Sequence, residues 1–198
     1  MRNPIDIKKP SPAEVLNYLA LWDSLENYML QESSLKKLFT KTYPLNNDLD
    51  DVLIKVCSLN DFYSTNIFSP FIVAKHIVSL SIDDDLSRGE LSIVDKIARV
   101  EVTGGKIKNF YSFASKYCSH HRPQIYPIYD SYVDQMLVYF KNTDNFYNFP
   151  RTDLKSYARY REILEKFRIF YKLDSFDLKQ IDKYLWQAGK KYFPKNYA

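Results

Sequence analysis

The sequence predicts an all-α protein, a single domain folded as an irregular bundle of about eight to ten helices. Only 4 of the 198 residues are glycine, which is too few for the phosphate loops and tight turns of a nucleotide-binding α/β fold. Hydrophobic residues make up 45% of the chain and charged residues 26%, an ordinary globular composition. A chain of this length can bury a core without disulfides or metals. Helix-start signals also recur along the chain.

Five helices are expected in the first half of the chain. A serine followed by a proline opens two of them, and an Asn-Asn-Asp cluster opens another, because such residues cap or fit the first helical turn. Three consecutive aspartates form the acidic first turn of a fifth, short helix. Apolar residues then recur every three to four positions. The expected ranges are 11–31, 34–41, 48–59, 69–80 and 83–89.

Five more helices are expected in the second half. From Lys106 to Ser119, apolar residues gather on one helical face, and lysines and serines on the other. Asp130 is expected to cap the helix that follows, and Ser175 the last one. The expected ranges are 94–100, 106–119, 130–141, 153–171 and 175–191.

Charge is unevenly distributed along the chain. Residues 1–100 hold 11 Lys and Arg against 14 Asp and Glu, whereas residues 101–198 hold 17 against 10. A basic half rich in Tyr and Phe is compatible with a nucleic-acid partner. An asymmetry of this size also arises by chance in ordinary proteins.

The cysteines and the N-terminal residues indicate a cytoplasmic protein. Cys57 and Cys118 match no metal-binding or redox spacing, so we expect both to be reduced thiols. Cys118, His120 and His121 are spaced too tightly for the usual zinc ligand pairs. The N-terminal residues lack the apolar run of a signal peptide, and no segment has the length of a membrane span. We expect no metal, no cofactor and no membrane partner.

One segment carries the functional hypothesis. The pair Gly104-Gly105, followed by Lys106, Lys108 and an expected helix, predicts a turn whose free N–H groups attract a phosphate. Some twenty residues later, the run from Tyr126 to Asp130 brings a carboxylate to the start of the next helix. In its simplest interpretation, Asp130 is a helix N-cap. Residues 104–137 resemble the centre of the helix-hairpin-helix DNA glycosylase superfamily, particularly its 8-oxoguanine DNA glycosylase-like branch.

The resemblance implies a glycosylase-like core over about 48–141, with the helices of 153–191 packed on it. It implies an enzyme that removes a damaged base, such as an oxidised purine, from DNA. Asp130 matches the essential aspartate of that superfamily. Its lysine nucleophile corresponds to Lys108 at the start of the expected helix, or in a related bacterial pattern to Lys116.

Of the two lysines, Lys108 is favoured because it lies at the hairpin end of the expected helix. Lys116 lies about 140° from the apolar face by the helical period, which predicts a solvated side chain. The remaining expected DNA contacts are Gly104, Gly105, Lys106, His120, His121 and Arg122. The expected base pocket is formed by Tyr129, Tyr132 and Phe113.

Two alternatives remain open at the level of the sequence. The first is a nucleic-acid-binding module that keeps the glycosylase scaffold without its chemistry. The second is a helical interaction protein with no nucleic-acid partner. The four-cysteine iron–sulfur cluster of some glycosylases is excluded, because two cysteines cannot build it.

Overall fold

The computed structural model describes residues 6–194, which form ten α-helices and one two-stranded sheet, so the predicted all-α fold is confirmed. A π-helical turn, η1, and a 3-10 helix, η2, complete the described chain. The elements are α1 (Pro12–Asp23), α2 (Glu26–Lys37), η1 (Leu38–Thr42), α3 (Leu49–Tyr63), α4 (Pro70–Ser79), α5 (Asp83–Arg88), α6 (Ser92–Ala98), β1 (Arg99–Val102), β2 (Lys106–Asn109), α7 (Tyr111–His121), α8 (Ser131–Asp144), η2 (Arg151–Lys155), α9 (Tyr157–Phe170) and α10 (Leu178–Tyr192).

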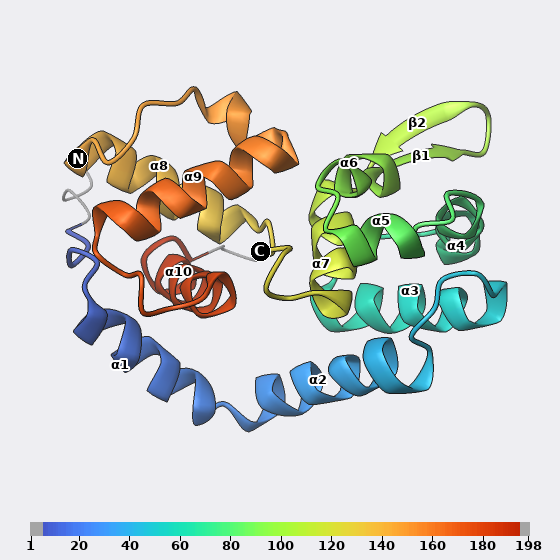
Figure 1. Cartoon of the computed structure of the whole chain (residues 1–198), viewed down its shortest axis with the longest axis horizontal. Coiled ribbons are helices and arrows are strands. Elements are labelled where there is room, and N and C mark those ends of the chain that lie inside the picture. The colour runs from blue at the N-terminus through green and yellow to red at the C-terminus, as the bar shows by residue number, and fades with distance from the viewer. Residues whose placement is uncertain (1–5, 195–198) are drawn as a thin grey trace.

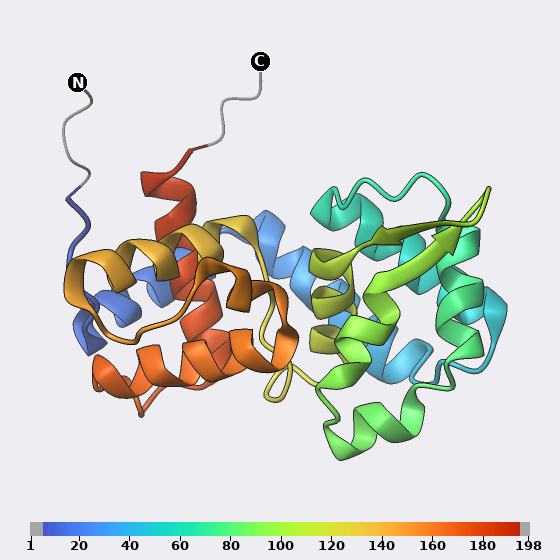
Figure 2. The same ribbon diagram turned by 90° about the horizontal axis from the view of Figure 1, so that it is seen from above.

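The elements form two groups, which lie side by side in Figures 1 and 2. One group holds α3 to α7 and the sheet, and the other holds α1, α8, α9 and α10. Helix α2 extends from α1 along the first group, and the segment between α7 and α8 crosses from one group to the other (Figure 1). One hydrophobic core contains residues of both groups. The junction between the groups is therefore packed, and side chains of α7 and α8 can meet there.

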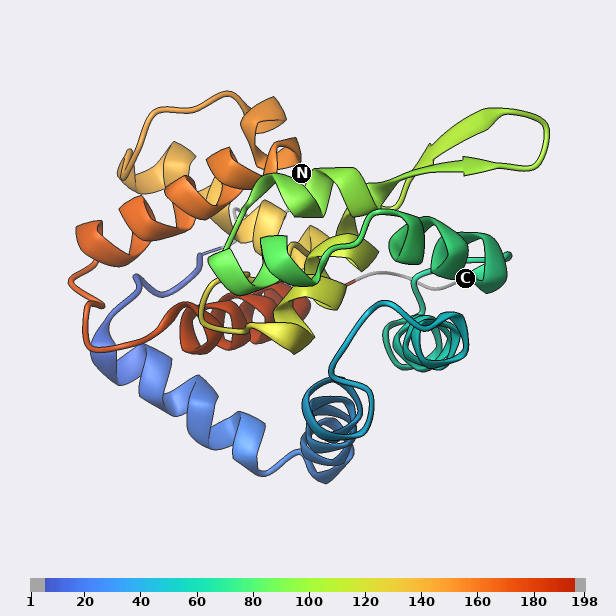
Figure 3. The same ribbon diagram turned by 45° about the vertical axis from the view of Figure 1, so that its right-hand side comes forward.

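The predicted helix over 106–119 is wrong in its first turn, because residues 99–109 form a β-hairpin. Strands β1 and β2 are antiparallel, with Val102 opposite Lys106. Gly104 and Gly105 have φ values of 85° and 74°, a left-handed conformation that suits glycine in a tight hairpin loop. Every residue of β2 is exposed, so Ile107 belongs to no buried helical face. The hairpin projects away from the helices in Figure 3.

The predicted helix over 11–31 is also wrong, because it is interrupted after Asp23. The N–H and the hydroxyl of Ser24 both donate to the carbonyl of Leu21, which ends α1 and turns the chain into α2. The turn brings the rings of Trp22 and Tyr28 to 5.6 Å between centroids. The favourable packing of these two aromatic rings stabilises the turn between α1 and α2.

The cap of the last helix is Asp177, and not Ser175 as predicted. The Asp177 carboxylate accepts the N–H of Gln180, and the Gln180 side chain accepts the N–H of Asp177. Such a reciprocal pair satisfies two donors at the helix start. Helix α10 therefore begins two residues later than a serine cap would place it.

Candidate functional site

Two cavities meet at the junction of α7, α8 and the end of α3. The first has a volume of about 310 Å³ and lies toward α1, α2 and α10. The second, of about 360 Å³, lies toward the start of α7 and η2. Four residues line both cavities: Tyr63, Ser64, Lys116 and Asp130. Lys116 and Asp130 therefore form part of the wall of each cavity.

Lys116 is buried, with only 4% of its side chain exposed. Its Nζ lies 3.6 Å from Asp130 Oδ2 and donates to Ser112 Oγ at 2.6 Å. It also lies 5.3 Å from the centre of the Tyr63 ring. The expectation of a solvated Lys116 is wrong, because α7 lies on the side of its group that faces the other group, and it is buried on nearly every side.

Asp130 is the N-cap of α8, as its position in the sequence predicts. Its Oδ1 accepts the backbone N–H of Tyr132 at 2.9 Å, while its Oδ2 faces Lys116. The Asp130 side chain is 19% exposed. The carboxylate is thus oriented by a helix start on one side and by an ammonium on the other, and it still reaches both cavities.

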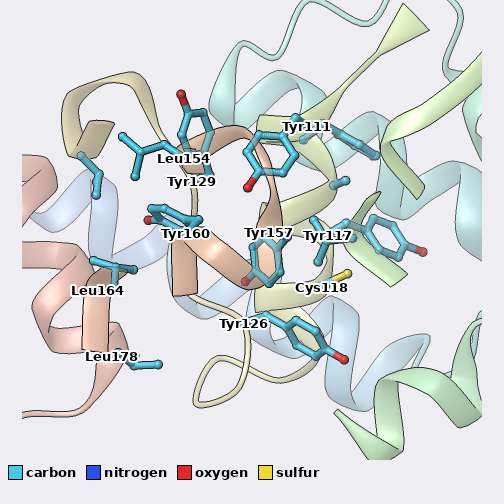
Figure 4. Packing of buried hydrophobic residues seen from close by; sticks show 14 of the residues in the cluster. Tyr111, Tyr117, Cys118, Tyr126, Tyr129, Leu154, Tyr157, Tyr160, Leu164 and Leu178 are labelled. Carbon is cyan, nitrogen blue, oxygen red and sulfur yellow. The ribbon is translucent and has the colours of Figure 1, made fainter. Parts of the chain in front are cut away.

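The segment before Asp130 is fixed by hydrogen bonds from α7 and α9. Ser112 Oγ donates to the carbonyl of Tyr129, and the N–H of Tyr129 donates to Ser115 Oγ. From the opposite side, the hydroxyls of Tyr157 and Tyr160 donate to the carbonyls of the two residues before Tyr129. Figure 4 shows these tyrosines in the buried core around Tyr129. Buried tyrosines need such partners for their hydroxyls, and here they hold the carboxylate-bearing turn.

Three aromatic rings, from α1, α2 and α10, line the first cavity. The ring centroids of Trp22, Tyr28 and Trp186 lie between 5.3 and 5.8 Å from one another. The amino group of Lys183 lies over Trp22, and that of Lys190 over Tyr28 and Trp186. Aromatic faces bordered by cations suit a flat ring attached to a phosphate backbone.

A buried amine beside a carboxylate has a definite chemical capacity. Once deprotonated, the amine can attack an electron-poor carbon and form a covalent intermediate. The carboxylate can stabilise positive charge that develops on that carbon. Lys116 and Asp130 have the residue types and the separation for both roles.

The structure places the other expected nucleophile elsewhere. Lys108 lies in the exposed strand β2 and lines neither cavity. Gly104, Gly105 and Lys106 form the loop end of the same hairpin. The expected phosphate-binding helix start at these glycines is therefore wrong, because a strand follows them. Only Asn109, where β2 ends, reaches the second cavity.

The two histidines expected to contact DNA make internal hydrogen bonds instead. His120 is buried and its Nε2 bonds the hydroxyl of Tyr63 at 3.0 Å. His121 Nε2 lies 3.1 Å from Asn46 Oδ1. Burial keeps the pKa of His120 well below its usual range and lowers that of His121 to about 3. Both rings are neutral at pH 7, so they offer no charge to a phosphate, whereas Arg122 is exposed.

The three expected base-pocket residues all line the cavities. Tyr129 and Phe113 belong to the second cavity, and Tyr132 to the first. The cavities also contain three residues that were not expected from the sequence: Tyr63 of α3, Ser64 at its C-cap and Asp182 of α10. Residues 59–67 contain the end of α3 and the turn after it, in which Asn60 is hydrogen-bonded to Thr65 and Ile67.

Within residues 6–194, no cluster of three or more His, Cys, Asp or Glu side chains is arranged to hold a metal ion. Over the same residues, none of the helices combines the length and apolar character that crossing a bilayer requires.

The fold and the site define an all-α protein with a buried lysine and a carboxylate at the junction of its two helical groups. Residues 14–125 match the HI_0787_N family, which is described as an N-terminal domain. The chain belongs to this family. It is also similar to an uncharacterized protein of Haemophilus influenzae strain Rd, with 46% identity over 149 residues, which are 75% of this chain and 71% of that protein. No solved structure matches the chain.

Proposed function

We propose that this protein is DNA glycosylase-like and removes a damaged base from DNA, with Lys116 as nucleophile and Asp130 as the electrostatic carboxylate. The observation that carries the proposal is the 3.6 Å contact between Lys116 Nζ and Asp130 Oδ2, where two cavities meet. Of the two lysines that the family resemblance indicates, only Lys116 lines these cavities.

The cavity walls support a substrate that enters as a single flipped nucleotide. A base must leave the duplex before an enzyme can act on its glycosidic bond, and flipped bases stack on aromatic side chains. Trp22, Tyr28 and Trp186 supply such rings in the first cavity. Tyr111, Phe113 and Tyr129 supply them in the second.

The proposed reaction begins when Lys116 gives one proton to water. The amine nitrogen then forms a bond to the sugar carbon C1′, and the bond from C1′ to the base breaks. Its electron pair leaves with the base, which takes up a proton. The attached nitrogen loses a proton, the ring oxygen leaves C1′ with its electron pair and is protonated, and a Schiff base results. Water hydrolyses it to free Lys116 and an abasic site.

In this reaction, Asp130 stabilises the positive charge that develops on the sugar. Breaking the glycosidic bond leaves positive charge on the sugar, and a carboxylate held beside it lowers the barrier. Because the start of α8 orients Asp130 through the N–H of Tyr132, the carboxylate keeps its position after Lys116 has lost its proton. The free thiols of Cys57 and Cys118 fit a reducing cytoplasm, where such a protein would act in DNA repair.

The test is borohydride trapping on a duplex that contains an abasic site, together with base release from a duplex that contains 8-oxoguanine. We expect the wild-type protein to form a covalent adduct and to release the base. Lys116→Met removes the amine at similar length and should abolish the adduct. Lys108→Met is the matched control, since this lysine is exposed and lines neither cavity, and it should leave both activities unchanged.

Other outcomes would contradict the proposal. Salt-dependent duplex binding without any adduct or base release, over several lesions, would favour a binding module, because phosphate neutralisation releases counterions. Absence of duplex binding would favour an interaction protein. An adduct that persists in Lys116→Met would remove Lys116 from the reaction.

A further inference from the structure

We infer that Asp182 is a second catalytic carboxyl of this site, which donates a proton to the nitrogen of the leaving base. The inference rests on the proposed glycosylase function and adds to it the group that activates the leaving base. Its basis is the position of the Asp182 side chain in the first cavity, together with Lys116 and Asp130.

Asp182 comes from the C-terminal helix α10, whereas Lys116 and Asp130 come from α7 and from the start of α8. The residue is 5% exposed, yet it lines the first cavity. Its carboxyl makes no hydrogen bond or ion pair with any residue of the described range 6–194. A buried carboxylate without such partners is costly, so the neutral form is favoured. In that form the carboxyl is a hydrogen-bond donor.

The charges around Asp182 come from several elements. Burial is the largest influence and raises the pKa of Asp182 to about 7. Lys179, on the same helix, and Lys116 lower this pKa, whereas Asp130 and Glu32 raise it. The tyrosines that face Asp182 from α3 and α9 are Tyr63, Tyr157 and Tyr160. A carboxyl with this pKa exchanges its proton near neutral pH, which is the property that a general acid requires.

The two carboxyls of the cavity have different environments and therefore suit different roles. Asp130 accepts a backbone N–H and faces an ammonium, so it is placed to accept hydrogen bonds and to stabilise positive charge. Asp182 is more deeply buried and caps no helix, and burial outweighs the influence of the Lys116 and Lys179 ammoniums on its pKa. One site can hold both an acid and a charged carboxylate when its two carboxyl groups lie in different surroundings.

The step that involves Asp182 is a simple proton transfer. As Lys116 Nζ bonds to C1′, the bond from C1′ to the base breaks and its electron pair moves to the base nitrogen. The carboxyl proton of Asp182 passes to the base, directly or through one water. Asp182 becomes a carboxylate, and it takes a proton from solvent before the next turnover.

The experiment measures single-turnover release of 8-oxoguanine from a duplex between pH 6 and 8.5, and borohydride trapping on an abasic duplex. Relative to trapping, which also needs the deprotonated Lys116 amine, the wild-type rate of base release should fall about tenfold per pH unit above pH 7, where Asp182 loses its proton. Asp182→Asn should release the base at least about 100-fold more slowly, without that pH dependence. Trapping should stay within about twofold of wild type, because an abasic site has no base to protonate.

Thermal unfolding of Asp182→Asn shows whether the variant is folded. Asp182→Glu retains a carboxyl and should recover part of the base release together with its pH dependence. If Asp182→Asn releases the base like wild type, with the same pH profile, the inference is wrong and the proposed function stands. If the folded variant loses trapping as well, Asp182 only positions Lys116, and the inference is wrong. If wild-type protein neither traps nor releases, both proposals fail.

Discussion

The Lys116 ammonium lies 3.6 Å from Oδ2 of Asp130, while Oδ1 of the same carboxylate accepts the N–H of Tyr132. One side chain thus connects α7 to α8 across the junction of the two helical groups. The helix start fixes the carboxylate, and the carboxylate compensates the buried ammonium. Stability and the proposed chemistry share this residue, and substitutions at position 130 can separate its two roles.

We predict that Asp130→Ala lowers the free energy of unfolding more than Asp130→Asn does. Asparagine caps a helix about as well as aspartate, whereas alanine does not, so the difference between the variants should be about 1 kcal/mol. Asp130→Asn should itself cost about 3 kcal/mol, because it leaves the buried Lys116 ammonium without its carboxylate. Urea unfolding of both variants at pH 7 measures these values. Equal stability of the two variants would contradict the role of Asp130 as a cap.

We predict that the protein loses stability as the pH falls below 6.5, because of His120 and His121. Burial lowers the pKa of both rings in the folded state, while the unfolded chain takes up protons near pH 6.5. Between pH 6.5 and about 5, each histidine should therefore lower the free energy of unfolding by roughly 1.4 kcal/mol per pH unit.

His121→Gln provides the comparison for this prediction. Glutamine keeps a donor for Asn46 Oδ1 but does not titrate. The free energy of unfolding of the variant should therefore depend less steeply on pH than that of the wild type over the same range. A variant with the wild-type slope would show that His121 is protonated in the folded protein.

We predict that Asp182 has the opposite effect, so that it lowers the free energy of unfolding as the pH rises. Its folded pKa is about 7, against a usual value of 3.8, so the folded protein holds a proton that the unfolded chain has lost. Stability contributed by the neutral carboxyl is complete below pH 3.8 and declines as the pH rises to 7. Asp182→Asn should therefore be more stable than wild type by up to roughly 4 kcal/mol at pH 7.5.

At pH 4 the same variant should show little difference from wild type. Denaturant unfolding at the two pH values tests this. Equal effects at both values would mean that the Asp182 carboxyl is already charged in the folded protein at pH 4.

The helices with strong cap signals could be predicted from the sequence, and the sheet could not. The caps at Ser11, Asp48 and Asp130 are present as expected, since a cap depends on a few neighbouring residues. Ile107 and Phe110 share the helical period of α7, yet the glycine pair turns the chain into a hairpin before the helix begins. Local periodicity cannot distinguish an apolar residue that is buried from one that is exposed.

The candidate site could be predicted only in part, for a related reason. The sequence indicated Asp130 and offered Lys116 as one of two lysines, but the helical period assigned Lys116 to solvent. A period locates a polar face, and it cannot show that this face is covered by a second group of helices. Asp182 lies 52 positions after Asp130 in the chain, so only the packing of α10 brings the two residues to one cavity.

That packing depends on Gly189, and we predict that Gly189→Ala destabilises the protein. A Cβ at this position would lie 2.7 Å from Tyr132 Cβ and 2.8 Å from the Tyr132 carbonyl oxygen. In a helix without this contact, alanine would be more stable than glycine by about 1 kcal/mol. A loss of stability would therefore show that the clash with Tyr132 outweighs the higher helix propensity of alanine. Because the contact involves backbone, α10 must move away from α8, and we expect a loss of about 2–3 kcal/mol.

Lys191→Ala is the matched control, since Lys191 is an exposed residue of the same helix, and it should change stability by less than about 0.5 kcal/mol. Gly189→Ala should also weaken base release more than borohydride trapping. Moving α10 displaces Asp182, whereas Lys116 and Asp130 are held by α7, α8 and α9. A Gly189→Ala protein as stable as wild type would show that α8 and α10 can separate at little cost, and the location of Asp182 in the cavity would then lose its structural basis.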